Sequence, residues 1–230
     1  MTSGPADLIS DRSPCRVLVF ARVPELGKVK TRLEKGIGAA GALAAHRELL
    51  MHTIAVVATF TARSERAGRA RTAAELCIAG EDSQGECAAL AERHGMMLSR
   101  QDCGDLGDRM ASALSAGLAR GERTVIVGSD CPVLAPGDLS EAFDRLARVE
   151  VVLAPSEDGG YALIGAARSL PPVFGDMPWS TSGVLAQTVH RLERAGLRYS
   201  LMRTLWDVDD QAGWQRWQAL QPAGSGRPTR

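Results

Sequence analysis

Short apolar runs alternate along the chain with longer segments whose apolar positions recur at helical spacing. The runs are rich in β-branched residues and bounded by turn-forming residues, which is the pattern of buried strands. We expect strands at residues 16–21, 74–79, 96–100, 124–128, 151–155, 161–165 and 198–203. We expect helices at residues 39–60, 106–119, 137–147, 183–195 and 211–220. This alternation predicts an α/β fold in which helices flank a mostly parallel central sheet.

The length of the chain suits one hydrophobic core. Of its 230 residues, 45% are hydrophobic, and we expect a single domain over residues 14–220. Residues 1–13 and 221–230 are rich in Gly, Pro, Ser and charge, so we expect flexible tails there. Residues 61–72 are polar and Arg-rich, which indicates a solvated helix end or loop.

Charge and composition exclude several classes of partner. The 27 basic and 27 acidic residues give a formal net charge of zero, so no global field favours nucleic acid or an anionic membrane. No apolar segment reaches the length of a signal peptide core or a membrane span, and we expect a cytoplasmic protein. The five cysteines are scattered without CxxC pairs, which favours reduced and mostly buried thiols. The oligomeric state stays open.

A basic loop follows the first expected strand. The sequence ARVPELGKVKTRLEKG spans residues 21–36 and gathers five cations, which are Arg22, Lys28, Lys30, Arg32 and Lys35. Ligands of open α/β sheets bind outside the carboxyl ends of strands, which is where this loop begins. The chain has only three lysines, and all three lie here. A solvated charged loop does not explain that bias, so we favour phosphate binding.

Two well-known nucleotide motifs are absent from this loop. A Walker A loop aligned on Gly27 and Lys28 would need Gly in place of Arg22 and Ser or Thr in place of Val29. No GxGxxG turn follows the strand either, which argues against a nicotinamide-dependent dehydrogenase.

Carboxylates follow two other apolar runs. Asp130 comes directly after TVIVGS, and a hard oxygen ligand there suits Mg²⁺ or Mn²⁺ bridging a diphosphate. The alternative is an Asx turn before Pro132. Near the C-terminus, LWDVDD offers Asp209 as a second metal ligand, with Asp207 as the other choice, whereas Asp210 is better placed to cap the helix that follows.

Three further segments allow both a functional and a structural interpretation. In EDGGYALIG, Asp158, Gly159, Gly160 and Tyr161 form either a polar site at a close backbone approach or a plain hairpin turn. In the segment with Gly104, Asp105 and Arg109, either Asp105 caps the following helix or the segment binds the base or ribose of a nucleotide. In the segment with Trp179, Ser180 and Thr181, either Ser180 or Thr181 caps a helix or the segment binds an acceptor.

The histidines carry no recognisable chemistry. His46, His52, His94 and His190 lie in helical or helix-end patterns without a paired nucleophile, so we expect structural or surface roles. The chain also lacks a Ser, His, Asp order or a Cys, His pair suited to acyl transfer.

Several of these segments together resemble a known family. The runs, in chain order, are VFARVPELGKVKTRL, GDLGDRM, GSDCP, EDGGYALIG, PWST and DVDD, and the resemblance as a whole covers about residues 17–214. They resemble the bacterial glycosyltransferase-A-like family formerly of unknown function, whose members are called nucleotide-diphospho-sugar transferases or arsenosugar-biosynthesis-type glycosyltransferases. KTRL is also similar to the segment in guanylyltransferases acting on phospholactate or phosphoenolpyruvate. The chain departs from the family at Arg22, where Lys is frequent, and at Asp210, where Thr is usual.

The resemblance implies a glycosyltransferase-A type fold with Mg²⁺ at Asp130. Our first hypothesis is glycosyl transfer from a nucleotide-diphospho-sugar to a small-molecule acceptor. In it Asp130 and Asp209 hold the metal, Lys28, Lys30 and Arg32 offset the charge of the departing nucleotide, and Asp158 is a candidate base. The second is nucleotidyl transfer with release of pyrophosphate. The third is a nucleotide-binding protein without turnover. The preference for glycosyl transfer rests on family analogy.

Overall fold

The computed structural model describes residues 13–170 and 172–220, which form one α/β domain. Its seven strands are β1 (Cys15–Arg22), β2 (Thr72–Ala79), β3 (Met97–Arg100), β4 (Arg123–Gly128), β5 (Val151–Pro155), β6 (Tyr161–Ala166) and β7 (Tyr199–Leu201). Its helices are α1 (Thr31–Arg66), α2 (Glu86–Arg93), α3 (Leu106–Ala119), α4 (Pro136–Leu146), α5 (Val184–Arg194) and α6 (Gln211–Leu220). The expected tails at 1–13 and 221–230 lie outside the described residues, except for Ser13.

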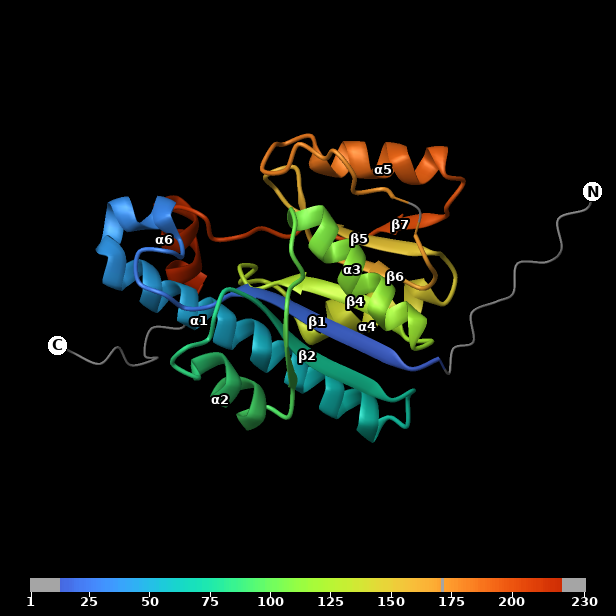
Figure 1. Ribbon diagram of the computed structural model, residues 1–230, viewed down its shortest axis with the longest axis horizontal. Helices are drawn as coiled ribbons and strands as arrows, with labels where there is room; N and C mark the ends of the chain where they lie inside the picture. Colours follow the sequence, from blue (N-terminus) through green and yellow to red (C-terminus); the bar gives the residue numbers. More distant parts are fainter. Residues whose placement is uncertain (1–12, 171, 221–230) are drawn as a thin grey trace, which may run out of the picture.

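One sheet runs through the domain in the order β3-β2-β1-β4-β6-β5-β7. All strand pairs are parallel except those made by β6, which lies antiparallel between β4 and β5. Helices cover both faces, with α1, α2 and α4 on one side and α3 and α5 on the other (Figure 1). The expected mostly parallel sheet flanked by helices is therefore confirmed.

Side-chain alternation along β1 explains the two covered faces. Val17 and Val19 pack with the core under α1 and α4, whereas Leu18 and Phe20 pack with the core under α3. A central parallel strand buried on both sides reads as a continuous apolar run, because each face of the sheet needs its own apolar side chains. That is the pattern seen at residues 17–21.

The first helix differs most from the expected elements. The sequence predicts a helix from residue 39, but α1 begins at Thr31 and kinks at Gly38, whose φ of 74° is non-helical. Arg32 and Lys35 therefore lie on a helical turn rather than in an irregular loop. The short helix α2 was not expected, because only two of its eight side chains, Cys87 and Ala91, are buried.

The reversal of strand order between β1 and β4 marks where a ligand would bind at the carboxyl edge of the sheet. The chain leaves β1 toward α1 on one face and enters β4 from α3 on the other, so the strand order reverses between β1 and β4. A crevice at such a reversal, outside the carboxyl ends of the strands, is where open α/β sheets bind ligands. Within the described part of the chain, no helix is long and apolar enough to cross a bilayer.

Candidate active site

A cleft opens at this reversal of strand order, and two adjoining cavities make it up. We call the cavity of about 660 Å³ the basic half, because its lining includes Arg22, Lys28, Lys30, Arg32 and Arg109. We call the cavity of about 440 Å³ the acidic half, because its lining includes Asp158 and Asp207. The residues that line both halves are Phe20, Arg22, Leu106, Gly128, Asp130, Trp179, Ser180 and Asp209.

Lys30 lies at the centre of the contacts between the halves. Its side chain is only 4% exposed, and its Nζ lies 2.8 Å from Asp130 Oδ2 and 3.5 Å from Asp209 Oδ1. The same Nζ donates a hydrogen bond of 2.6 Å to the carbonyl of Val208. The backbone at Lys30 is left-handed, with φ of 51°, and this places the residue at the N-cap of α1. A non-glycine residue in that region costs of order 1–3 kcal/mol, which its contacts must offset.

The other loop cations are much freer. Lys28 is 68% exposed and pairs with Glu25, and Arg32 is 72% exposed with its Nη1 3.5 Å from Asp209. Arg22 is exposed at the end of β1. Lys35 is exposed on α1 and is absent from the lining of either half. The segment thus contributes one buried lysine that holds carboxylates and three exposed cations, Arg22, Lys28 and Arg32, that line the basic half.

Buried polar side chains fix the floor of the basic half. His46 on α1 is 3% exposed, and its Nε2 lies 3.0 Å from the carbonyl of Arg22. Burial lowers the pKa of His46, so the neutral ring anchors the end of β1. Gln101 donates to the carbonyls of Ala21 and Cys77 and accepts a 3.0 Å hydrogen bond from Arg109.

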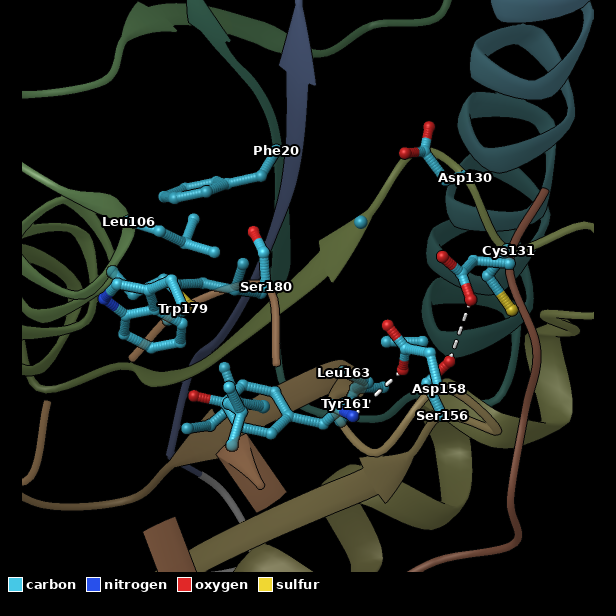
Figure 2. Close-up of a pocket in the computed structure, with 18 of the residues that line it drawn as sticks. Phe20, Leu106, Asp130, Cys131, Ser156, Asp158, Tyr161, Leu163, Trp179 and Ser180 are labelled. Carbon is cyan, nitrogen blue, oxygen red and sulfur yellow. Dashed lines mark hydrogen bonds between the residues drawn. The ribbon is translucent and has the colours of Figure 1, made fainter. Parts of the chain in front are cut away.

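Two unlike walls face each other across the acidic half. Figure 2 shows Phe20, Leu106 and Trp179 on one side and Asp130 and Asp158 on the other. The apolar wall comes from β1, α3 and the loop before α5, whereas the carboxylates come from the ends of β4 and β5. Tyr161 lies between the two walls at the start of β6, and burial raises the pKa of its hydroxyl.

Asp207 and Asp209 reach the cleft by a segment that follows β7. The N–H of Val208 donates to the carbonyl of Asp130 at 3.0 Å, and Ser156 Oγ donates to Asp207 Oδ1 at 3.0 Å. These bonds bring residues near position 208 beside the loops after β4 and β5. Burial raises the pKa of Asp207 above its ordinary value, and the negative charges of Asp209, Asp158 and Asp130 raise it further.

The two expected metal ligands do lie together. Asp130 and Asp209 share the ammonium of Lys30 and keep 40% and 48% of their side chains exposed. The alternative role of Asp130 was an Asx turn before Pro132. The hydrogen bonds described for its side chain come instead from Lys30 and Ser129. Asp207 is turned toward Ser156 instead. In the described residues, no group of three or more His, Cys, Asp or Glu side chains is placed to hold a metal ion by itself.

Of the three expected nucleotide-binding residues at the start of α3, two line the basic half and one does not. Asp105 caps α3 through a reciprocal bond with Asp108, so the capping interpretation is confirmed, although the residue also lines the basic half. Arg109 lines that half as well. Gly104 lines neither half and has φ of 104°, and a side chain there would meet Asp108. Gly104 is therefore needed for the turn into α3.

The expected acceptor-binding residues also divide. Gly160, Tyr161, Trp179, Ser180 and Thr181 line the acidic half, whereas Gly159 does not. At Gly159 a Cβ would overlap the backbone of Ser182, and φ is 89°. The segment is both a hairpin turn between β5 and β6 and a close backbone approach, so the two interpretations coexist.

The capping alternative at the start of α5 is wrong. Gly183 occupies the N-cap of α5, and Thr181 Oγ1 donates to the carbonyl of Pro178 rather than capping the helix. Ser180 adopts a left-handed backbone with φ of 65° and faces the cleft. By contrast, Asp210 accepts from the N–H of Gly213 at 2.9 Å, which confirms its predicted capping role.

Sequence reasoning missed part of the supporting shell. His46 has the structural role expected for it, whereas the sequence does not point to Gln101 or Ser156. The only available signal for Ser156 was its position directly after an apolar run, which it shares with Asp130. The positions of His46 and Gln101 depend on helix packing and on the pairing of β2 with β3, which the sequence pattern does not specify.

The doubly wound sheet and the cleft at its carboxyl edge define the nucleotide-diphospho-sugar transferase type of fold, which solved structures share with this chain. The chain belongs to the DUF2064 family, described as uncharacterized proteins conserved in bacteria, whose profile matches residues 61–181. Comparison with curated proteins gives no match.

Solved structures similar to this chain are transferases. A protein of Desulfovibrio desulfuricans G20, provisionally described as a nucleotide-diphospho-sugar transferase, is 28% identical with a TM-score of 0.73, and the match covers 85% of this chain and 82% of that one. The 4-diphosphocytidyl-2C-methyl-D-erythritol synthase of Anaerococcus prevotii DSM 20548 is 9% identical with a TM-score of 0.61, covering 93% and 98%. A CMP:2-keto-3-deoxy-manno-octonic acid synthetase complexed with CTP is 13% identical with a TM-score of 0.53, covering 90% and 98%. At these identities the latter two show the fold alone.

Proposed function

We propose that the protein is a transferase that uses a nucleotide-diphospho-sugar as glycosyl donor and a small molecule as acceptor. The observation that carries the proposal is one cleft with two chemically different halves, joined where Asp130 and Asp209 line both. A donor of this class is polyanionic at one end and rich in hydroxyl groups at the other. The similarity to a nucleotide-diphospho-sugar transferase from Desulfovibrio supports the same assignment.

The basic half suits the nucleotide end of such a donor. Arg22, Lys28, Arg32 and Arg109 line it, and the first three lie on or beside the loop that leaves β1. Cations in fixed positions stabilise the charge that develops as a nucleoside diphosphate departs. Lys30 acts differently, because its buried ammonium holds Asp130 and Asp209 at the junction of the halves.

Asp130 and Asp209 also fit a divalent cation of the Mg²⁺ or Mn²⁺ kind. They are hard oxygen donors, both are about half exposed, and a magnesium ion is commonly held by one or two carboxylates with the remaining positions filled by phosphate oxygens and water. Two carboxylates of the protein are therefore enough. When bound, such an ion supplies Lewis-acid neutralisation of the diphosphate.

Asp158 is the candidate general base for the acceptor hydroxyl. It is exposed at the turn between β5 and β6, and its Oδ1 accepts the N–H of Gly160 at 2.9 Å. That bond orients the carboxylate and leaves Oδ2 available to accept a proton. Gly160, Tyr161, Trp179, Ser180 and Thr181 would line the acceptor side. Asp158 lies in the acidic half, opposite Trp179, where an acceptor would enter (Figure 2).

Nucleotidyl transfer with release of pyrophosphate is the second candidate. The gathering of Arg22, Lys28 and Arg32 around one loop favours it, because several cations suit the higher charge of a triphosphate. The shared fold with cytidylyl-transferring enzymes is compatible with this alternative. A nucleotide-binding protein without turnover is the third.

One assay separates the three. Purified protein is incubated with Mg²⁺, a panel of nucleotide sugars and nucleoside triphosphates, and a metabolite extract. Release of nucleoside diphosphate supports glycosyl transfer, pyrophosphate supports nucleotidyl transfer, and binding without either product supports the third candidate. Asp130→Asn should abolish turnover in the first two cases and leave the far-UV spectrum unchanged. The matched control is Asp144→Asn, because Asp144 is an exposed carboxylate outside the cleft.

A second test addresses the phosphate-binding role of the loop. Lys28→Ala should weaken nucleotide binding and reduce its dependence on salt, because an exposed cation acts mainly through screened electrostatics. Lys35→Ala is the control, since Lys35 is also exposed but lines neither half of the cleft. Identical titrations for both variants and the unaltered protein would remove Lys28 from the site.

A further inference from the structure

The acidic half has a charge balance opposite to that of the basic half. Asp158 and Asp207 line it and do not line the basic half. Among the described residues, the one Arg, Lys or His in its lining is Arg22, which lies at the boundary shared with the basic half. A group that enters the acidic half therefore meets carboxylates without cations of its own.

The two carboxylates are not neutralised by neighbouring basic side chains. Asp207 accepts from the hydroxyl of Ser156, and Asp158 accepts from the backbone N–H of Gly160. No ion pair with either carboxylate occurs within the described residues. By contrast, Lys30 neutralises part of the charge at Asp130 and Asp209. The ion pairs of Lys30 are confined to that second pair, so Asp158 and Asp207 have no ion-pair partner of their own among the described residues.

The rest of the lining offers apolar surface and hydroxyl groups. Phe20, Leu106 and Trp179 form the wall opposite the carboxylates (Figure 2). An apolar ring face beside carboxylate acceptors suits a polyol, because its C–H face packs on rings while its hydroxyls donate to the carboxylates. A phosphate or carboxylate has no proton to donate at neutral pH, and its charge is repelled.

We propose that the acidic half selects an uncharged, hydroxyl-bearing sugar and excludes sugars that carry a carboxylate or phosphate. This inference rests on the proposed function, since it assumes that the nucleotide end of the donor lies in the basic half. The same charge balance disfavours a phosphate acceptor, and therefore disfavours nucleotidyl transfer to a phosphorylated substrate. The substrate class is thus a nucleotide-diphosphate derivative of a neutral sugar.

Matched donors that differ by one charge test the proposal. Binding of UDP, GDP and CDP is first measured by calorimetry with Mg²⁺ to find the nucleotide that the basic half accepts. For a uridine site the pair is UDP-glucose and UDP-glucuronate, and for a guanosine site it is GDP-mannose and GDP-mannuronate. A cytidine site is tested with CDP-glucose and CDP-glucuronate. Each pair replaces a hydroxymethyl group by a carboxylate and keeps the sugar ring.

The neutral member should bind at least about tenfold more tightly than the uronate at low salt, because the uronate faces carboxylates in a partly desolvated cavity. Asp207→Asn should narrow this gap, because it removes a charge that repels the uronate while the amide oxygen can still accept from a sugar hydroxyl. Asp158→Asn should narrow it in the same direction. Asp144→Asn, outside the cleft, should leave the gap unchanged.

The outcomes separate this proposal from the proposed function. Equal or tighter binding of the uronate, or a gap that both cleft variants leave intact, overturns the inference while the donor class stands. No binding of UDP, GDP or CDP overturns the proposed function, and the inference with it. A neutral-sugar preference that both asparagine variants reduce supports the charge selection.

Discussion

Lys30→Met removes one buried charge from the junction of the cleft and should destabilise the protein measurably. The ammonium now bonds to the carbonyl of Val208 at 2.6 Å and pairs with Asp130 and Asp209. Methionine keeps most of the length of the apolar stem, so the change removes the charge and the donors rather than the packing.

The expected magnitude follows from the exposure of each partner. Leaving the Val208 carbonyl without its donor should cost about 1–3 kcal/mol. Each carboxylate is 40–48% exposed and can regain water, so each lost ion pair should cost only about 0–1 kcal/mol. Together these terms predict a loss of about 1–5 kcal/mol in the free energy of unfolding.

Urea denaturation followed by circular dichroism measures this loss. With a slope of about 2–3 kcal/mol/M, the midpoint should fall by roughly 1 M. The matched control is Lys28→Met, because Lys28 is 68% exposed and pairs with the exposed Glu25, and its effect should stay within about 0.5 kcal/mol. If Lys30→Met also stays within that range, Lys30 does not hold the cleft together and our account of the junction is wrong.

Two further predictions concern the framework of the cleft. Gly159→Ala should lower the free energy of unfolding by about 2–4 kcal/mol, because φ is 89° and the new Cβ would overlap a neighbouring backbone. The control is Gly137→Ala, which lies in open space within α4 and should be neutral or slightly stabilising in the same denaturation assay. Comparable losses in both would contradict the close approach. Burial raises the pKa of Glu150, but hydrogen bonds from Arg198 outweigh it and leave the pKa below the ordinary 4.5. The resulting stabilisation is present above pH 4.5 and is lost as the pH falls through the lowered folded-state pKa. Glu150→Gln should therefore make the free energy of unfolding depend less steeply on pH at acid pH. The same steepness in the variant and the unaltered protein would refute this.

The fold was largely predictable because its signals are local. The strands β1, β4, β5 and β6 appear in the sequence as short apolar runs, and the bounds of α3 and α6 agree with those expected. Where the prediction failed, the local signal was weak or misleading. Gly36 and Gly38 discourage a helix near the start of α1, yet the helix forms there and kinks at Gly38, which packing against the rest of the domain permits.

The candidate site was predictable in its chemistry but not in its internal contacts. The lysine bias singles out the loop after β1, and the position of Asp130 just beyond an apolar run points to the edge where ligands bind. The sequence does not separate Lys28 from Lys30. One is exposed and free to face the cleft, while the other is buried on two carboxylates, because only Lys30 adopts the left-handed backbone that turns it inward.

The sequence by itself determined the class of fold, the basic loop and the carboxylates, because each depends on residue type and local spacing. The tertiary structure decided which of these groups meet. Asp209 reaches Asp130 only because the segment after β7 runs beside the loop after β4, joined by the bond from Val208 to Asp130. The division of the cleft into a basic and an acidic half likewise depends on packing α3 and α5 over the sheet. Contacts between residues 80 to 180 positions apart follow from strand order, which residue patterns along the chain do not encode.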